Sequence, residues 1–191
     1  MISIPYGRTH IACDLTPNGL LTSRIEELTS EKSGIELVRE ALANPIGSKP
    51  LHELAVGKKS CTIIISDHTR PVPSRDILPP MLRALRKGNP DIDITLLVAT
   101  GFHRPTSRRE LFDKLGRDIA IFEKIVVHDA FDPDSNVEIG ILPSGAPLVI
   151  DRTAVETDLL ISEGFIEPHF FARYEQACRR IRLPLLPLRF Q

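Results

Sequence analysis

The stretch CTIIISDHTRPVP, residues 61–73, joins an apolar, β-branched run to a cluster of polar residues that ends in two prolines. A short run of this kind is typical of a buried strand, and the abrupt change to Asp, His, Thr and Arg predicts a loop where the strand ends. A second stretch, ITLLVATGFHRPT at residues 94–106, repeats the arrangement. The two stretches therefore predict two strands, each followed by a polar loop.

The segments around these stretches alternate between strand and helix patterns. Strands are predicted at residues 61–66, 92–98, 124–128 and 158–162, and helices at 74–86 and 107–115. Strands that alternate with helices form a parallel sheet, because each helix returns the chain to the edge where the next strand begins. The predicted fold class is therefore α/β, with a Rossmann-like, mostly parallel sheet flanked by helices.

Segments outside this alternation add smaller elements. An N-terminal hairpin is predicted around Gly7, and a further hairpin is predicted near 136–150, where two extended runs flank a Pro-Ser-Gly turn. A helix is expected within residues 30–47, where serines can cap its start and Asn-Pro stops it. A short helical piece is expected over residues 50–56.

Composition excludes several classes of protein. The 191 residues contain 24 Lys and Arg against 25 Asp and Glu, so no global field exists that would gather nucleic acid or an anionic membrane. Three cysteines form neither a disulfide framework nor a metal pattern. No apolar run reaches the roughly 18 residues of a membrane span. We therefore expect one α/β domain in the cytoplasm, with no nucleic-acid or membrane partner.

Three polar loops follow predicted strands, and each contains a histidine and a proline. They are the loops at 66–71, 100–105 and 162–169. In an open parallel sheet the loops at the carboxyl ends of the strands meet at one edge, where ligands bind. Because proline fixes φ, these loops are stiff. The sequence therefore predicts a ligand site built from rigid loops that carry imidazoles.

The first loop allows two interpretations. Arg70 offers a planar fork for a carboxylate or phosphate, and Asp67 and Thr69 offer hydrogen bonds to the same ligand. Alternatively, Asp67 forms a turn and Arg70 is a solvated surface charge. The density of distinct polar groups favours ligand binding, because a turn does not require them.

The histidines of the other two loops are candidates for acid/base chemistry. His103 follows a glycine that permits close backbone approach, and His169 follows Glu163 and Glu167. Either histidine alone is equally compatible with a structural role. Zinc ligation by His103 and His169 is a weaker alternative, because no local metal-binding spacing supports it. The histidines outside these loops have no comparable setting and receive no role.

Five segments carry a family resemblance. They are NPIGS, SDHTRPVPS, LVATGFHRPT, LPSG and DLLISEGFIEPHFF, in this order across residues 44–171. Together they resemble the nickel-pincer-nucleotide-dependent lactate racemases and their relatives. The resemblance implies that residues 1–171 form the N-terminal α/β domain of a cytoplasmic two-domain isomerase. It also implies that the nickel-pincer nucleotide is bound by Asp67, His68, Thr69 and Arg70. The implied acid/base residues are His103 and His169.

The family's reaction interconverts the enantiomers of a small 2-hydroxyacid. The resemblance implies that one histidine removes the hydroxyl proton while hydride passes from C2 to the pyridinium ring of the cofactor. A racemase that accepts two mirror-image alcohols benefits from one base for each hand. Two histidines on two loops meet that need.

The chain departs from the family pattern after Phe171. The family continues with a GFSGGRK-like segment whose lysine is joined to the cofactor, whereas residues 172–191 form a basic tail rich in Pro, Leu and Arg. The covalent lysine, the nickel-ligand histidine and the family's C-terminal domain are absent from this chain. We therefore expect a truncation or frame shift near Ala172, and an isolated chain that is inactive.

A second class of function stays open alongside the racemase domain. The chain is also compatible with a non-catalytic α/β module that binds a small phosphorylated or carboxylated ligand through Arg70 and the three loops. Its expected small-molecule partner is a 2-hydroxyacid or related anion. Its expected protein partner is the missing C-terminal domain or a second copy of the chain, because a domain deprived of its partner exposes apolar surface.

Overall fold

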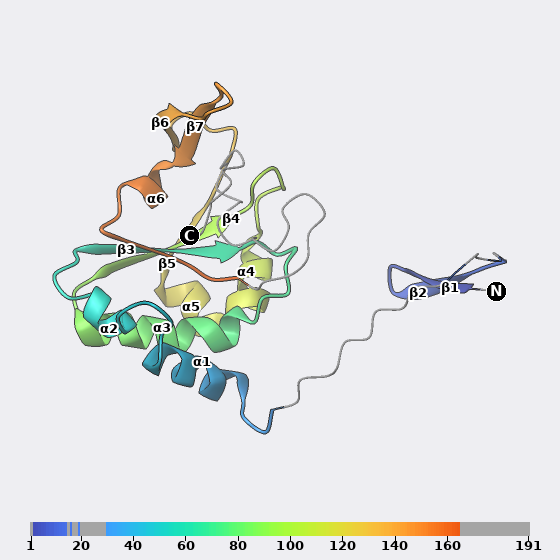
Figure 1. Ribbon diagram of the computed structural model, residues 1–191, viewed down its shortest axis with the longest axis horizontal. Helices are drawn as coiled ribbons and strands as arrows, with labels where there is room; N and C mark the ends of the chain where they lie inside the picture. Colours follow the sequence, from blue (N-terminus) through green and yellow to red (C-terminus); the bar gives the residue numbers. More distant parts are fainter. Residues whose placement is uncertain (1, 15, 17–18, 20–29, 165–191) are drawn as a thin grey trace. The chain divides into compact units, whose positions relative to one another are not determined.

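The computed structural model describes residues 2–14, 16, 19 and 30–164 (Figure 1). The chain divides into two compact units, Met1–Glu31 and Lys32–Gln191. In the first unit, β1 (Ile2–Tyr6) pairs antiparallel with β2 (Thr9–Cys13). Gly7 in the turn has φ 60°, a left-handed conformation that glycine adopts without steric cost. The predicted N-terminal hairpin is therefore confirmed.

The second unit contains a four-stranded parallel sheet in the order β5-β4-β3-β8. Its strands are β3 (Ser60–Ser66), β4 (Asp93–Ala99), β5 (Lys124–Val127) and β8 (Leu159–Ser162). The register places Ile63 opposite Leu96 on one side and Ile161 on the other. The predicted α/β fold with a parallel sheet is confirmed, and each strand boundary lies within about one residue of its predicted position.

Five helices of this unit lie on one side of the sheet (Figure 1). They are α1 (Gly34–Ala43), α2 (Leu51–Leu54), α3 (Ser74–Gly88), α4 (Arg108–Leu115) and α5 (Arg117–Phe122). Ser33 and Ser107 begin α1 and α4 with capping boxes, in which serine and a glutamate three residues later bond each other's backbone N–H. Helix α5 was not predicted. It begins directly after Gly116, whose φ of 84° ends α4.

The core follows from the alternation of side chains along the strands. Ile63, Ile65, Leu96 and Val98 are fully buried against the helices, where they meet Leu78 of α3. A smaller cluster covers the opposite face of the sheet; it contains Ile64, Leu97, Ala99, Ile150 and Ala154. Both faces of β3 and β4 are thus covered, which is why these strands read as continuous apolar runs.

The second cluster uses side chains from the hairpin and helix on that face of the sheet. These elements are β6 (Asn136–Ile141), β7 (Pro147–Asp151) and α6 (Arg152–Val155). Strands β6 and β7 pair antiparallel, with a register shift between Glu138 and Gly140. The hairpin that the sequence predicted near 136–150 is therefore confirmed. Its position above the sheet is visible in Figure 1.

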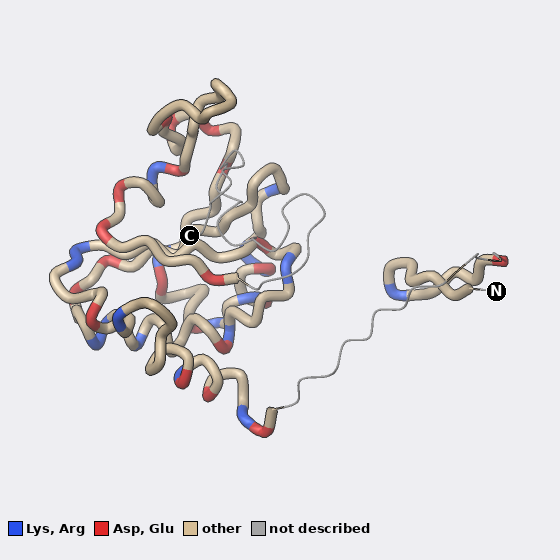
Figure 2. Tube along the Cα trace, in the orientation of Figure 1, with Lys and Arg blue, Asp and Glu red and all other residues tan. Residues whose placement is uncertain are grey.

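Charges are spread over the second unit without segregation of sign. Figure 2 shows Lys and Arg interspersed with Asp and Glu along its helices and loops. Among the helices of the described residues, none combines the length and apolar character needed to cross a bilayer.

Helices α2 and α3 approach closely at Gly88, which yields the first prediction. A Cβ added at Gly88 would overlap the backbone carbonyl of His52 in α2, whereas one at Gly140 meets nothing within 4 Å. We expect Gly88→Ala to lower the free energy of unfolding by about 1–3 kcal/mol, as overpacking generally does. Gly140→Ala is the control, and urea denaturation measures both. Equal stability of the two variants would contradict the close approach.

Candidate functional site

The first two polar loops leave the sheet side by side. Ser66 and Ala99 are paired at the carboxyl ends of β3 and β4, so Asp67 and Thr100 begin neighbouring loops. The third loop starts at Glu163, whose backbone N–H donates to the carbonyl of Ile64 at 2.9 Å. Glu167 and His169 lie outside the described residues.

Asp67 and His103 form the central contact of the site. The Asp67 carboxylate is completely buried, and its Oδ2 lies 2.5 Å from His103 Nδ1. Its Oδ1 accepts hydrogen bonds from the backbone N–H of Thr69 at 3.1 Å and from the Thr69 hydroxyl at 2.7 Å. The sequence suggested that Asp67 and Thr69 bond a ligand. In the structure they bond each other and His103, because the short loop turns their polar atoms inward.

This contact determines which imidazole nitrogen of His103 can do chemistry. Nδ1 faces the carboxylate and therefore carries the proton, which leaves Nε2 as the second nitrogen. The side chain of His103 is 44% exposed, whereas that of Asp67 is fully buried. The second loop thus exposes His103 to solvent while the buried Asp67 carboxylate holds its ring in place. This arrangement is expected of a general base with an orienting partner.

His68 points toward a neighbouring helix. Its Nδ1 lies 3.1 Å from the Thr106 hydroxyl, and its Nε2 lies 3.9 Å from Glu110 Oε1. Arg104 donates two hydrogen bonds to the same carboxylate, at 2.5 and 2.9 Å. The hydrogen bonds from Arg104 have the largest effect on the pKa of Glu110, followed by those from Ser107. Together they hold this pKa well below its ordinary value. Glu110 therefore remains ionised and links the first two loops to α4.

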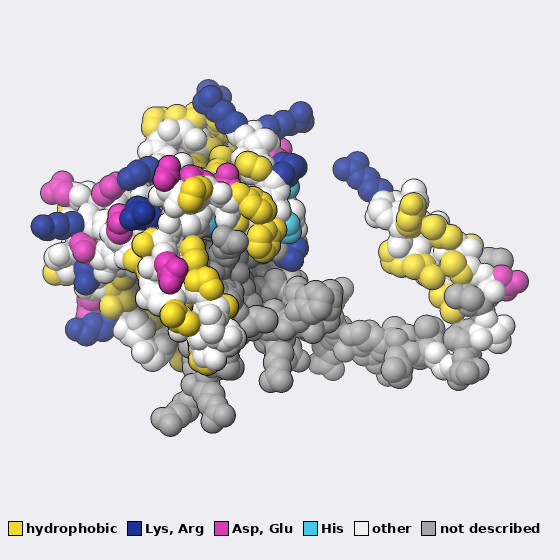
Figure 3. Space-filling model, turned by 90° about the horizontal axis from the view of Figure 1, so that it is seen from above, with side chains coloured by type: hydrophobic (Ala, Val, Ile, Leu, Met, Phe, Trp, Pro, Cys, Tyr) yellow, Lys and Arg dark blue, Asp and Glu magenta, His cyan; other side chains and the backbone are white. Residues whose placement is uncertain are grey.

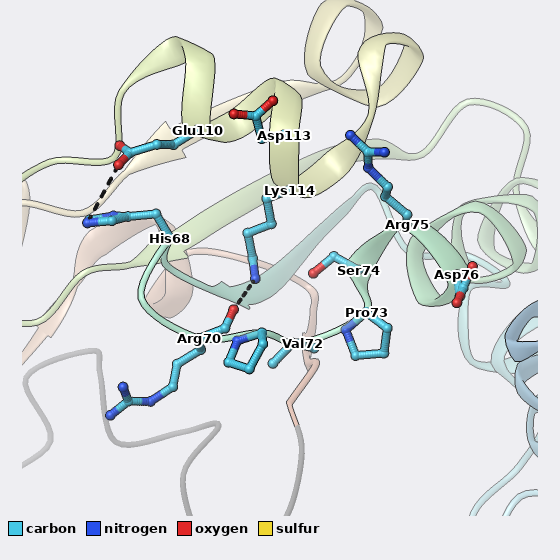
Figure 4. Close-up of a pocket in the computed structure, with 11 residues that line it drawn as sticks. His68, Arg70, Val72, Pro73, Ser74, Arg75, Asp76, Glu110, Asp113 and Lys114 are labelled. Carbon is cyan, nitrogen blue, oxygen red and sulfur yellow. Dashed lines mark hydrogen bonds and ion pairs between the residues drawn. The ribbon is translucent and has the colours of Figure 1, made fainter. Parts of the chain in front are cut away.

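A pocket of about 510 Å³ lies between the first loop, the start of α3 and α4 (Figure 4). Its basic side chains are Arg70, Arg75 and Lys114. Lys114 donates to the backbone carbonyl of Arg70 at 3.1 Å, so the ammonium group is held against the first loop. Figure 4 shows this bond, with His68 and Glu110 facing each other farther along the wall.

Three cationic side chains and three acidic ones, Asp76, Glu110 and Asp113, line this pocket, so an anion would bind locally beside the cationic groups. Helix α3 has 15 residues, and its N-cap, Pro73, provides no side-chain hydrogen bond to the first turn. The backbone N–H groups of Ser74, Asp76 and Ile77 already bond the carbonyls of Val72 and Pro73, so the helix start contributes its dipole to the pocket. Nearby guanidinium groups favour carboxylate or phosphate. Sequence reasoning identified Arg70 but missed Arg75 and Lys114. Their helical positions resembled ordinary solvated charges. The place of Arg75 just after the first polar loop could have signalled it, whereas Lys114, in the last turn of α4, carried no such signal.

His128, to which the sequence analysis assigned no role, is buried beside the site. His128 directly follows β5, and its Nδ1 lies 2.8 Å from Asp151 Oδ2. Burial acts to raise the pKa of Asp151, but hydrogen bonds from His128 and Thr153 outweigh it, so the pKa is lowered. The carbonyl of His128 accepts a 2.5 Å hydrogen bond from Thr100. The His128–Asp151 pair therefore connects the end of β7 to the first residue of the second loop.

Two exposed aromatic rings pack together at the second loop, where Phe102 directly precedes His103. The rings of Phe102 and Phe131 lie 5.7 Å apart at an interplanar angle of 56°, and the two residues are 70% and 74% exposed. Figure 3 shows hydrophobic side chains exposed close to histidines on the surface seen from above.

Metal ligands do not gather in the part of the chain that the structure describes. No group of three or more His, Cys, Asp or Glu side chains is arranged there to hold an ion. The zinc alternative from the sequence depends on His169, which lies outside the described residues.

Together, the parallel sheet and the Asp67–His103 contact at its carboxyl edge define an α/β domain with a histidine-containing site. Residues 6–180 match the family described as the lactate racemase N-terminal domain. The chain belongs to this family, which confirms the resemblance that the five sequence segments carried.

Two curated relatives are lactate racemases. That of Thermoanaerobacterium thermosaccharolyticum is 48% identical over 176 residues, which are 91% of this chain and 41% of the relative. That of Lactiplantibacillus plantarum is 49% identical over 176 residues, which are 91% of this chain and 42% of the relative. This chain therefore spans about two fifths of the length of these relatives.

Two solved structures have folds similar to that of this chain. The lactate racemase apoprotein from Thermoanaerobacterium thermosaccharolyticum matches with a TM-score of 0.78 at 49% identity, over 90% of this chain and 40% of that one. A Thermotoga maritima protein matches with a TM-score of 0.55 at 20% identity, over 71% of this chain and 34% of that one, and shows the fold alone.

The three hydrogen bonds to Asp67 yield the second prediction. Asparagine offers a single acceptor oxygen and cannot serve both Thr69 and His103. We expect Asp67→Asn to lower the free energy of unfolding by about 1–3 kcal/mol and to abolish the protected Nδ1 proton signal of His103. Urea denaturation and NMR measure the two effects. The exposed Asp91→Asn serves as control, and an unchanged His103 proton in Asp67→Asn would contradict the contact.

Proposed function

We propose that this chain is the cofactor-binding and catalytic domain of a lactate racemase-like enzyme that interconverts enantiomers of a small 2-hydroxyacid. Membership of the family supports the reaction class. The observation that carries the proposal is the Asp67–His103 pair, because it presents an oriented imidazole at the ligand-binding edge of the sheet. Residues 1–171 would form this domain, and the basic tail at 172–191 would lie beyond it.

His103 would act as general base and acid toward one enantiomer. With Nδ1 bonded to Asp67, its Nε2 takes the proton from the substrate hydroxyl. The imidazolium that forms lies against a buried carboxylate, which stabilises it and returns the ring to the same orientation for the reverse transfer. His169 would perform the same step for the opposite enantiomer, since the family resemblance assigns it the second base.

The basic pocket would hold the anionic groups. Arg70, Arg75 and Lys114 would attract a carboxylate or a phosphate, and the nickel-pincer nucleotide implied by the family carries a phosphate. Asp67, His68, Thr69 and Arg70 form the segment that would hold it. When bound, this cofactor supplies the ring that accepts hydride from the substrate. The covalent lysine and nickel-ligand histidine of the family are absent from this chain, so residues outside it would complete the enzyme.

A second candidate function is a non-catalytic module that binds a small anion. The basic pocket favours it, because Arg70, Arg75 and Lys114 all come from the second unit and need no further domain. Anion binding without racemisation in a completed enzyme would identify this function.

Racemisation by a completed enzyme yields the third prediction. In a chimera, residues 6–164 of this chain replace the matching segment of the Thermoanaerobacterium thermosaccharolyticum racemase, and the holoenzyme is assayed with L-lactate by chiral chromatography. We expect racemisation, and we expect His103→Ala to reduce kcat at least about 100-fold, as loss of a general base does. His10→Ala, an exposed histidine of β2, is the control. Full turnover in His103→Ala would refute the acid/base assignment.

Binding of inorganic sulfate to the 191-residue chain yields the fourth prediction. A charge-assisted hydrogen bond contributes about 1.5–3 kcal/mol, so we expect Arg70→Ala to weaken sulfate binding about tenfold or more in calorimetry. Added NaCl should weaken binding of the wild type as well, because salt screens the attraction. Arg83→Ala changes an exposed arginine of α3 and should have no effect. Equal affinity in Arg70→Ala and Arg83→Ala would exclude the pocket as the anion site.

A further inference from the structure

Glu163 is a buried carboxyl group directly behind the basic pocket. It follows β8 and begins the third loop, and it is only 4% exposed. Its Oε1 accepts a 2.5 Å hydrogen bond from the hydroxyl of Ser74. Ser74 is the first residue of α3, is completely buried and lines the pocket. This hydrogen bond therefore joins the start of the third loop to the helix that forms the pocket wall.

The surroundings of Glu163 disfavour a negative charge. Within the described residues, its Oε2 is buried and has no hydrogen-bond partner. An ionised carboxylate at this position would keep one oxygen uncompensated, which is costly in a buried site. Burial raises the pKa of Glu163, and the hydrogen bond from Ser74 and the positive charge of Lys114 offset this only in part. Around the pocket the titratable and charged side chains are His68, Arg70, Arg75, Asp76, Glu110, Asp113 and Lys114.

We propose that Glu163 is a positioning residue of the anion pocket, and that its carboxyl group holds Ser74 and the first turn of α3 in place while it remains neutral. This inference rests on the proposed anion binding. A neutral carboxyl group keeps the hydrogen bond to Ser74 and adds no negative charge behind Arg70, Arg75 and Lys114. An ionised one would oppose an incoming anion and occupy the favourable potential at the start of α3.

The sign of the pH dependence follows from this placement. The pKa of Glu163 is higher in the folded chain than in the unfolded one, so the unfolded chain gives up its proton first as the pH rises. Stability is therefore lost between the unfolded and the folded pKa as pH increases. Anion affinity falls over the same transition of the folded protein. Sulfate is the suitable probe, because its charge stays constant from pH 5 to 9, whereas that of phosphate does not.

NMR titration tests the protonation state directly. In the full 191-residue chain labelled with ¹³C-glutamate, the carboxyl carbon of Glu163 is assigned as the signal that Glu163→Gln removes. We expect its midpoint to lie clearly above about 4.5, the ordinary value for glutamate. A midpoint at or below that value would overturn the proposal, because the buried carboxyl group would then ionise as easily as an exposed glutamate.

Sulfate binding tests the positioning role. We expect Glu163→Gln, which keeps the shape and the hydrogen bond, to bind sulfate as tightly as wild type below the Glu163 midpoint and to weaken less above it. Glu163→Ala and Ser74→Ala should each weaken binding about fivefold, the effect of one lost hydrogen bond. Glu156→Gln, an exposed glutamate at the end of α6, is the control.

The outcomes separate this inference from the proposed function. Absence of sulfate binding in the wild type would overturn the anion pocket and, with it, this role of Glu163. Sulfate binding with identical pH profiles in wild type and Glu163→Gln would overturn the role of Glu163 alone. If Glu163→Ala fails to fold by circular dichroism, Glu163→Gln and Ser74→Ala decide the question, since both keep the buried volume nearly unchanged.

Discussion

The parallel pairing of β3 with β4 is the constraint on which the site depends. Both strands are covered on both faces, so their register cannot slip without exposing apolar side chains. That register ends with Ser66 opposite Ala99 and places two polar loops next to each other. The 2.5 Å contact between Asp67 and His103 then joins the loops across the sheet edge. The buried pairing of β3 with β4 thus fixes the position of the exposed His103.

Three carboxyl groups at this edge are buried in different ways. Asp67 accepts hydrogen bonds from Thr69 and His103, and Asp151 accepts them from Thr153 and His128. Among the described residues, Glu163 has one side-chain donor, Ser74, and its pKa is raised. Buried charge is tolerated where donors surround it and is suppressed where they do not. The site therefore combines two carboxyl groups that bond histidines, Asp67 and Asp151, with one, Glu163, that we propose to be neutral.

Family membership and the site geometry support the proposed function in different ways. Identity of 48% to a lactate racemase identifies the family, but the match covers 41% of that relative's length. The described residues contribute an oriented histidine and a basic pocket, which are groups that bind an anion and move a proton. The hydride-accepting group and the second base would come from a cofactor and from residues beyond those described.

The sequence by itself determined the strands, the parallel sheet and the two polar loops, because apolar β-branched runs and helix caps act locally. It also identified His103 and Arg70, because each stands in a polar cluster after a strand. Only the tertiary structure decided that Asp67 turns inward to His103, that Arg75 and Lys114 line the pocket, and that His128 and Glu163 are buried beside it. These contacts join residues 23 to 89 positions apart, as in His128–Asp151 and Ser74–Glu163, and such pairings depend on packing that no local pattern encodes.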